Sequence, residues 1–268
     1  MSKRIQNAAS PKLNGLLALI PARSGSQRIP QKNIRAFFGH PMIAYAIAAA
    51  QNSGLFQRLV VSSDSAEIGR IANWYGAEFL QRPPELAKDS VGVKDVALHA
   101  LKALASRDGF SPEALCQLMP NCPLRRSEDI AAHYKLFQQG RRDFQISVVG
   151  YRGVYPQWSL AKNQNGEGSW LFGEHMVNSQ KLQRACCPTG AIWWARTNSF
   201  LEQETFYGKP FHLAEMDANR GLDLDTLEDL ELAELLVRGL SERDRKSPLE
   251  PVTQTKFIVR KVQAHGSR

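Results

Sequence analysis

Short apolar segments alternate along this chain with longer segments in which apolar residues recur every three or four positions. The short segments predict strands, and they occupy residues 16–20, 59–61, 114–119, 144–149 and 190–196. The first of them has no polar position, which is typical of a strand buried on both faces of a parallel sheet. The longer segments predict amphipathic helices. Strands that alternate with helices indicate βαβ units, so we expect an α/β fold with a mostly parallel sheet.

Turn and capping residues set the expected limits of these helices. Pro41 fits the first turn of the first helix and Gly54 its end. Ser127 and Thr197 are expected to cap two later helices. Thr226 opens the last long helix with an arrangement that resembles a capping box.

The alternation stops between residues 151 and 188, where Gly, Asn, Gln and scattered aromatic residues replace it. A segment of this length without regular structure usually has a functional role, although it could be simply a long loop. We expect flexible tails at residues 1–14 and 246–268, which leaves one domain over residues 15–245. In the second tail, residues 257–259 could pair as an edge strand.

The charge of the chain is concentrated at its ends. The net charge is +8, but residues 1–12 carry +3 and residues 242–268 carry +4, so about +1 remains for the rest. We therefore expect a local pocket for small anions and no nucleic-acid groove. No apolar run reaches the roughly 20 residues of a membrane span, and residues 1–12 lack the apolar core of a secretory signal. We expect a cytoplasmic protein that does not contact the membrane.

A cationic loop follows the first strand directly, with the sequence P-A-R-S-G-S-Q-R-I-P-Q-K-N at residues 21–33. Its small residues allow backbone N–H groups to approach an anion closely, and Arg23, Arg28 and Lys32 can neutralise it. The pattern predicts a phosphate-binding loop. The alternative is a surface loop whose cations are solvated.

Two aspartates, Asp223 and Asp225, form the sharpest acidic feature. Residues two apart in an extended segment point to the same side, so both carboxylates can meet one ion. Oxygen ligands suit Mg²⁺, which offsets the charge of a triphosphate at the phosphorus under attack. The alternative is that Asp225 caps the following helix while Asp223 is solvated.

Seven segments between about Leu16 and Val237 resemble, in order, the acylneuraminate cytidylyltransferase family, the synthetases of CMP-sugar acids. The loop at 21–33 matches the family's opening I-P-A-R-x-G-S-K-x-x-P-x-K-N. The others are G-H-P-M-I at 39–43, V-S-S-D at 61–64, R-P-P-E-L-A at 82–87, P-N-C-P-L-R at 120–125, P-T-G-A-I at 188–192 and L-D-L-D-T at 222–226. The resemblance implies a Rossmann-like, three-layer α/β/α fold of the nucleotide-diphospho-sugar-transferase type. It also implies a homodimer, in which the excursion at 151–188 packs against the second subunit and covers the sugar site.

The resemblance implies an enzyme that transfers CMP from CTP to the anomeric hydroxyl of a nonulosonic, sialic-acid-like sugar acid and releases pyrophosphate. Its implied catalytic residues are Arg23, Lys32, Asp223 and Asp225, with Mg²⁺ on the two aspartates. The expected nucleotide contacts are Ala22, Arg23, Ser24, Gly25, Ser26, Arg28, Lys32, Asn33, Ser63, Asp64, Arg82, Pro120, Asn121 and Cys122. The expected sugar contacts are Gln180, Arg184, Gly190 and Ala191.

Two positions and one segment depart from the family pattern. Gln27 stands where a lysine is usual, and Met119 stands where a glutamine is common and cannot make an amide's hydrogen bonds. Gln117 could replace that amide only if the strand register shifts. Of the family's R-R-Q-D motif, the segment 178–183 keeps only Gln180.

These departures leave two alternatives open. One is a nucleotidyltransferase of the same fold with a different nucleotide or acceptor, which Met119 favours. The other is a catalytically weakened homologue that binds a nucleotide or sugar, which the changed segment 178–183 favours.

Overall fold

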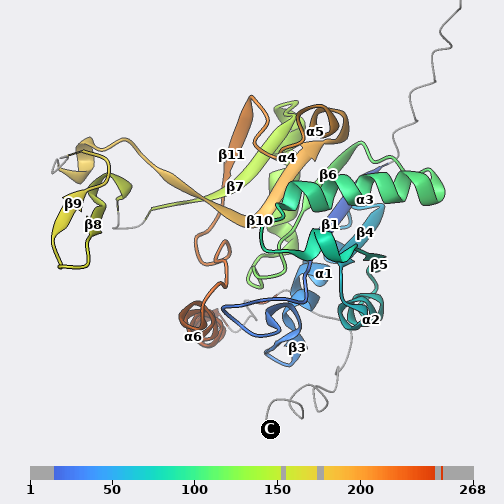
Figure 1. Cartoon of the computed structure of the whole chain (residues 1–268), viewed down its shortest axis with the longest axis horizontal. Helices are drawn as coiled ribbons and strands as arrows, with labels where there is room; N and C mark the ends of the chain where they lie inside the picture. Colours follow the sequence, from blue (N-terminus) through green and yellow to red (C-terminus); the bar gives the residue numbers. More distant parts are fainter. Residues whose placement is uncertain (1–14, 152–154, 174–177, 245–248, 250–268) are drawn as a thin grey trace, which may run out of the picture.

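A seven-stranded sheet forms the centre of the protein (Figure 1). The computed structural model describes residues 15–151, 155–173, 178–244 and 249. The strand order is β11-β7-β10-β6-β1-β4-β5. In chain order the strands are β1 (Leu16–Pro21), β4 (Arg58–Ser63), β5 (Glu78–Gln81), β6 (Ala114–Gln117), β7 (Phe144–Gly150), β10 (Cys186–Arg196) and β11 (Phe211–Glu215). Among these strands only β10 runs antiparallel to its neighbours, so the expectation of a mostly parallel sheet is confirmed.

Helices cover both faces of the sheet and make three layers, as the resemblance implies. They are α1 (Met42–Asn52), α2 (Ala66–Trp74), α3 (Val93–Asp108), α4 (Ser127–Gln139) and α5 (Thr197–Gln203), whereas α6 (Leu227–Asp244) packs with residues of α1 and with Phe37. Side chains alternate across β1: Leu17 and Leu19 pack with residues of α3 and α5, whereas Ala18 and Ile20 pack with residues of α1, α2 and α4. Because both faces of β1 are covered, the strand has no polar position.

The start of α6 agrees with the expectation from the sequence, whereas the starts of α1, α4 and α5 differ from it. Thr226 Oγ1 accepts a hydrogen bond from Asp229 N at 3.2 Å, and Asp229 Oδ2 accepts one from Thr226 N at 2.8 Å, so the capping box of α6 is confirmed. Ser127 was expected to cap α4 but is its first residue, because Asp129 Oδ2 accepts from the backbone N of Arg126 at 3.0 Å.

Two further corrections concern the starts of α5 and α1. Thr197 is the first residue of α5, since the cap position belongs to Arg196. Pro41 occupies the cap position of α1 instead of its first turn, because it pairs in the short strand β3 (His40–Pro41) with β2 (Ala36–Phe37). The strands β5 and β11 and this short pair were not expected from the sequence.

Residues between β7 and β10 leave the sheet where the alternation of apolar residues stops (Figure 1). This excursion contains β8 (Leu160–Lys162), paired with β9 (Gly168–Trp170), and the short 3-10 helices Pro156–Trp158 and Ser179–Lys181. The strand β10 begins at Cys186, four residues before the expected start. Its register with β7 is interrupted between Pro188 and Trp193, and Gly190 lies in that irregularity.

The expected tails at 1–14 and 246–268, with the edge strand at 257–259, lie outside the described residues apart from Leu249. Leu249 packs with α6 residues and with Phe37 and Met42 in a third apolar cluster. None of the helices in the described part of the chain is long and apolar enough to cross a bilayer.

Candidate active site

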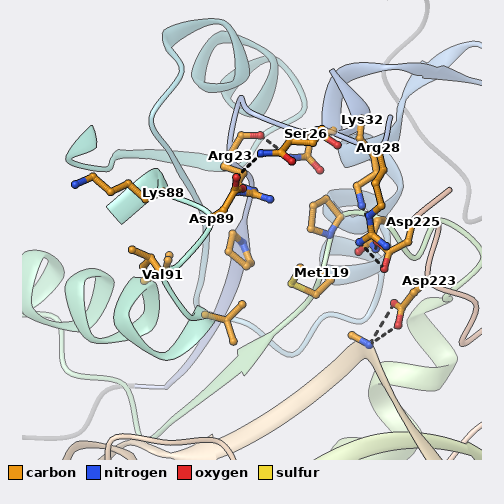
Figure 2. A pocket seen from close by; sticks show the side chains of 18 of the residues that line it. Arg23, Ser26, Arg28, Lys32, Lys88, Asp89, Val91, Met119, Asp223 and Asp225 are labelled. Carbon is orange, nitrogen blue, oxygen red and sulfur yellow. Dashed lines mark hydrogen bonds and ion pairs between the residues drawn. The ribbon is translucent and has the colours of Figure 1, made fainter. Parts of the chain in front are cut away.

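A cavity of about 560 Å³ opens where the parallel strands β1, β5 and β6 end. Open α/β sheets commonly bind ligands at this edge. Of the expected site residues, those that line it are Arg23, Ser26, Arg28, Lys32, Asn33, Arg82, Pro120, Asn121, Gly190, Asp223 and Asp225. Lys32 and Asp223 therefore share one cavity, although 190 positions separate them in the chain (Figure 2).

Asp225 meets the cationic loop. Its Oδ1 accepts a hydrogen bond from Lys32 Nζ at 2.8 Å, and its Oδ2 lies 3.1 Å from a guanidinium nitrogen of Arg28 (Figure 2). Burial alone would raise the pKa of Asp225, but the hydrogen bond and charge of Lys32, with Arg28, hold that pKa below its ordinary value. Asp225 is therefore an ionised carboxylate at neutral pH. Its negative charge holds two cations beside the cavity.

Asp223 has a different environment. Its two oxygens accept hydrogen bonds from Gly190 N, at 3.2 and 3.0 Å, and Oδ1 also accepts one from Cys122 Sγ at 2.6 Å. Burial, together with the charge of Asp225, raises the pKa of Asp223. A Cβ at position 190 would lie 2.7 Å from Met119 Cγ and 3.2 Å from Asp223 Oδ1. Glycine is thus required there, because the backbone N–H must approach the carboxylate closely.

The alternative role for Asp225, as the cap of α6, is wrong. Thr226 and Asp229 make that cap, and Asp229 Oδ2 also accepts from Asp225 N at 3.0 Å. The capping contacts leave both oxygens of Asp225 to Lys32, Arg28 and Asn121.

The two aspartates are suited to hold a hard cation. Like charges that face one cavity repel, and the pKa of Asp223 rises in part for this reason. A divalent cation between them would relieve the repulsion. No cluster of three or more His, Cys, Asp or Glu occurs among the residues that the structure describes. Two carboxylates with room for water and phosphate oxygens fit Mg²⁺, which keeps part of its hydration in protein sites.

Asp89 was not expected at the site. Its carboxylate pairs with Arg23 and accepts a hydrogen bond from Gln27 Nε2 at 2.6 Å (Figure 2). Gln27, where the family usually has lysine, thus holds an acidic side chain of the segment before α3. Asp89 lies two residues beyond the R-P-P-E-L-A segment, and this proximity could have indicated that it lies near the site.

Several expected nucleotide contacts do not line the cavity. Asp64 Oδ1 accepts from Ser24 N at 3.0 Å, and the Ser63 hydroxyl accepts from Ser65 N at 3.1 Å. Burial raises the pKa of Asp64, but the hydrogen bonds from Ser24 outweigh it, so the pKa is lowered. The other expected contacts outside the lining are Ala22, Gly25 and Cys122. All of them are ligand contacts only as predictions, and the contact observed between Ser24 and Asp64 holds the loop against the end of β4.

The expected sugar contacts divide in the same way. Gly190 lines the cavity, whereas Ala191 is buried and its carbonyl oxygen accepts from Arg125 Nη1 at 2.7 Å. Gln180 and Arg184 lie in the excursion, outside the cavity lining, and Arg184 pairs with Glu215 at 2.5 Å. Their roles in binding a sugar stay predictions.

An apolar wall faces the cationic loop, and the sequence indicated little of it. Met119 and Trp193 line the cavity with the α3 residues Val93 and Val96. Trp194, in contrast, is fully buried in the core. Gln117 lies in β6, opposite Leu19 and Trp193, and is completely buried. Met119 lines the cavity and Gln117 does not, so Gln117 does not take the place of the missing amide.

Comparison with known proteins shows what the whole chain is similar to. The profile of the cytidylyltransferase family matches residues 17–152. The chain is 32% identical to the pseudaminic acid cytidylyltransferase of Campylobacter jejuni over 83% of this chain and 96% of that protein. It is 33% identical to the CMP-N,N'-diacetyllegionaminic acid synthase of Campylobacter jejuni over 85% of this chain and 98% of that protein.

A relative and a solved structure extend the comparison. The N-acylneuraminate cytidylyltransferase of Escherichia coli is 32% identical over 81% of this chain and 51% of its own length. The structure of CMP:2-keto-3-deoxy-manno-octonic acid synthetase complexed with CTP superposes with a TM-score of 0.62, covering 85% of this chain and all of that one at 16% identity. At that identity the superposition supports the fold.

Proposed function

Since the chain belongs to the cytidylyltransferase family, we propose that it transfers the CMP group of CTP to the anomeric hydroxyl of a nonulosonic, sialic-acid-like sugar acid. The bond from the sugar oxygen to the α-phosphorus forms as the bond to pyrophosphate breaks. Relatives named for pseudaminic, legionaminic and N-acylneuraminic acid support this class of acceptor.

The observation that carries the proposal is the meeting of the cationic loop and the acid pair in one cavity. Lys32 and Arg23 would stabilise the charge that develops on the α-phosphate and the departing pyrophosphate. Positioning of the two substrates would supply much of the remaining catalysis.

We infer that Asp223 and Asp225 hold Mg²⁺. A bound Mg²⁺ would offset charge on the phosphate oxygens of CTP. The support is the donor set, two carboxylates that line one cavity, in which the charge of Asp225 raises the pKa of Asp223. In its presence, Lys32 and Arg28 would be free to turn from Asp225 toward phosphate oxygens.

We further propose a homodimer built on the excursion. Its side chains Leu160, Leu171 and Phe172 are 58%, 54% and 61% exposed. Large apolar side chains gathered on a protruding segment favour a partner surface, and the family resemblance makes a second copy the expected partner. The cytoplasmic location expected from the sequence stays a prediction.

The decisive experiment measures pyrophosphate release from CTP, UTP, ATP and GTP with a panel of nonulosonic acids. We expect release with CTP and at least one acid, and none with Asp225→Ala. Met119 favours the rival in which another nucleotide is used, so release with UTP or a purine nucleotide and none with CTP would select that rival. Nucleotide binding without release from any pair would select the weakened homologue.

A further inference from the structure

The turn after β6 contacts the acid pair, Asp223 and Asp225, through Asn121 and Cys122. Cys122 Sγ donates to Asp223 Oδ1 at 2.6 Å, and Asn121 Nδ2 donates to Asp225 Oδ1 at 3.3 Å. Between the two aspartates, Leu224 N donates to the carbonyl oxygen of Asn121 at 2.8 Å. Two consecutive residues of one turn therefore hold three consecutive residues of another segment, about 100 positions away.

The Cys122 side chain does not reach the cavity in this structure. It is 1% exposed and lies outside the cavity lining. What it contacts is the carboxylate that lines the cavity. Together with Gly190 N, the thiol supplies donors to Asp223 that fix the plane of its carboxylate.

From this geometry we propose that Cys122 and Asn121 are positioning residues that aim Asp223 and Asp225 at a divalent cation. The importance of these residues for catalysis rests on the proposed function. The inference itself is that their hydrogen bonds orient the carboxylates of Asp223 and Asp225. Outer partners that orient metal-binding carboxylates commonly change metal affinity or activity by 10- to 100-fold when removed. The turn therefore affects the reaction through the acid pair, besides any contact that Pro120 and Asn121 make in the cavity.

A purely structural role for Cys122 is the competing explanation, because the residue also packs in the apolar cluster beside α1. Cys116 belongs to the same cluster, is 0% exposed, and makes no contact to either aspartate among its described hydrogen bonds. Truncation of Cys116 thus empties a comparable buried volume without changing Asp223. Cys116→Ala is the matched control for Cys122→Ala, and Cys122→Ser restores a donor.

The test is a titration of the full chain with Mn²⁺, in which electron paramagnetic resonance measures the concentration of free ion and thus the affinity. Asp223→Asn gives the baseline. We expect Cys122→Ala to weaken Mn²⁺ binding by about tenfold or more, and Cys122→Ser to bind within about threefold of the unsubstituted protein. Cys116→Ala should bind as the unsubstituted protein does. In turnover, kcat should fall for Cys122→Ala while the KM for CTP changes little.

Asn121→Ala keeps the test decisive if Cys122→Ala does not fold, because it removes the donor to Asp225 and leaves the backbone contact to Leu224. It too should weaken Mn²⁺ binding. Unchanged affinity in Asn121→Ala and Cys122→Ala, equal losses in Cys116→Ala, or a failure of Cys122→Ser to restore binding would overturn the inference. Absent Mn²⁺ binding by the unsubstituted protein would overturn it as well.

The same preparations separate this inference from the proposed function. Mn²⁺ binding that depends on Cys122, without pyrophosphate release from CTP and any acid, would reject the function and keep the inference. Pyrophosphate release together with normal Mn²⁺ binding by Cys122→Ala would do the reverse.

Discussion

Lys32 and Arg28 both pair with Asp225, but their surroundings differ. The side chain of Lys32 is 15% exposed and that of Arg28 is 64% exposed. An ion pair that is largely desolvated interacts more strongly than one at the surface, where water and salt screen the charges. The two cations should therefore contribute unequally to catalysis.

We predict that Lys32→Gln lowers kcat for pyrophosphate release by about 100-fold, the usual loss when one donor to a developing anion is removed. Arg28→Gln should lower it by less than about tenfold, because solvent already screens that charge. Lys102→Gln, on an exposed position of α3, is the control and should leave kcat unchanged. Equal losses in the first two variants would contradict the ranking.

The environment of Asp223 makes a prediction for the pH profile. Burial, aided by the charge of Asp225, raises its pKa above the ordinary 3.8. A protonated carboxyl is a poor metal ligand, so activity should be lost as the pH falls through the raised pKa. Bound Mg²⁺ competes with the proton, so the measurement is activity at Mg²⁺ well below saturation, where the acid limb should lie above pH 3.8. Circular dichroism over the same range separates this loss from unfolding, and a limb at or below 3.8 in folded protein would contradict the prediction.

The residues that the sequence could identify stand next to one another in the chain. Arg23 and Lys32 share one loop, and Asp223 and Asp225 share one extended segment, so spacing alone shows that they can act together. Asp89 could not be found in this way, because its contact with Arg23 exists only after the segment before α3 folds over the cavity. Trp193 could not be found in this way either, because only the pairing of β10 with β6 brings it to the cavity.

At the scale of elements, the capping box of α6 also fixes the backbone of Asp225, because Asp229 Oδ2 accepts from the N–H groups of both Asp225 and Thr226. We predict that Thr226→Ala lowers the free energy of unfolding by about 1 kcal/mol, the usual cost of a lost cap. Thr226→Ser should keep the stability, since its hydroxyl can still accept from Asp229 N. Denaturation in urea measures both, and an equal loss in the two variants would argue against the cap.

The packing of α4 on the sheet buries His133, and burial lowers its pKa to about 4. The unfolded chain takes up a proton near pH 6.5 and the folded protein does not, so stability falls as the pH drops from 6.5 toward 4. We predict a loss of about 2 kcal/mol between pH 7.5 and pH 5 from this group. The measurement is urea unfolding at both pH values. His133→Gln should lose less stability over the same interval, and an identical loss would contradict the assignment to His133.

The limits of the elements were less predictable than their existence. Ser127 and Thr197 satisfy the composition of a cap, yet each lies one residue inside its helix. At α4 the start is decided by the Asp129 carboxylate, which accepts from the N–H of Arg126. Such a choice depends on the side chain three residues later and on its packing, which the spacing of apolar residues does not report.

For the whole molecule, the alternation of apolar segments predicted an α/β fold with a mostly parallel sheet but not the strand order. Unbroken apolar strands indicate burial on both faces, whichever neighbour each strand has. The antiparallel direction of β10 follows from the excursion, which returns the chain to the sheet at the same end at which β7 leaves it (Figure 1). The break in the apolar pattern at 151–188 predicted where the chain leaves the sheet. It did not predict that β7 and β10 pair as they leave, or that β8 and β9 form a separate two-stranded sheet.

The excursion carries the last prediction, because its apolar side chains are exposed in a single chain. We predict that the protein sediments as a dimer and that the double variant Leu171→Asp, Phe172→Asp sediments as a monomer. Both side chains are more than half exposed, so the charges should not disturb a folded core. The matched control is Leu235→Asp on α6, which is 66% exposed and lies outside the excursion. A dimer that dissociates with Leu235→Asp and survives the double variant would move the interface to α6, and a monomer at all concentrations would reject the proposed assembly.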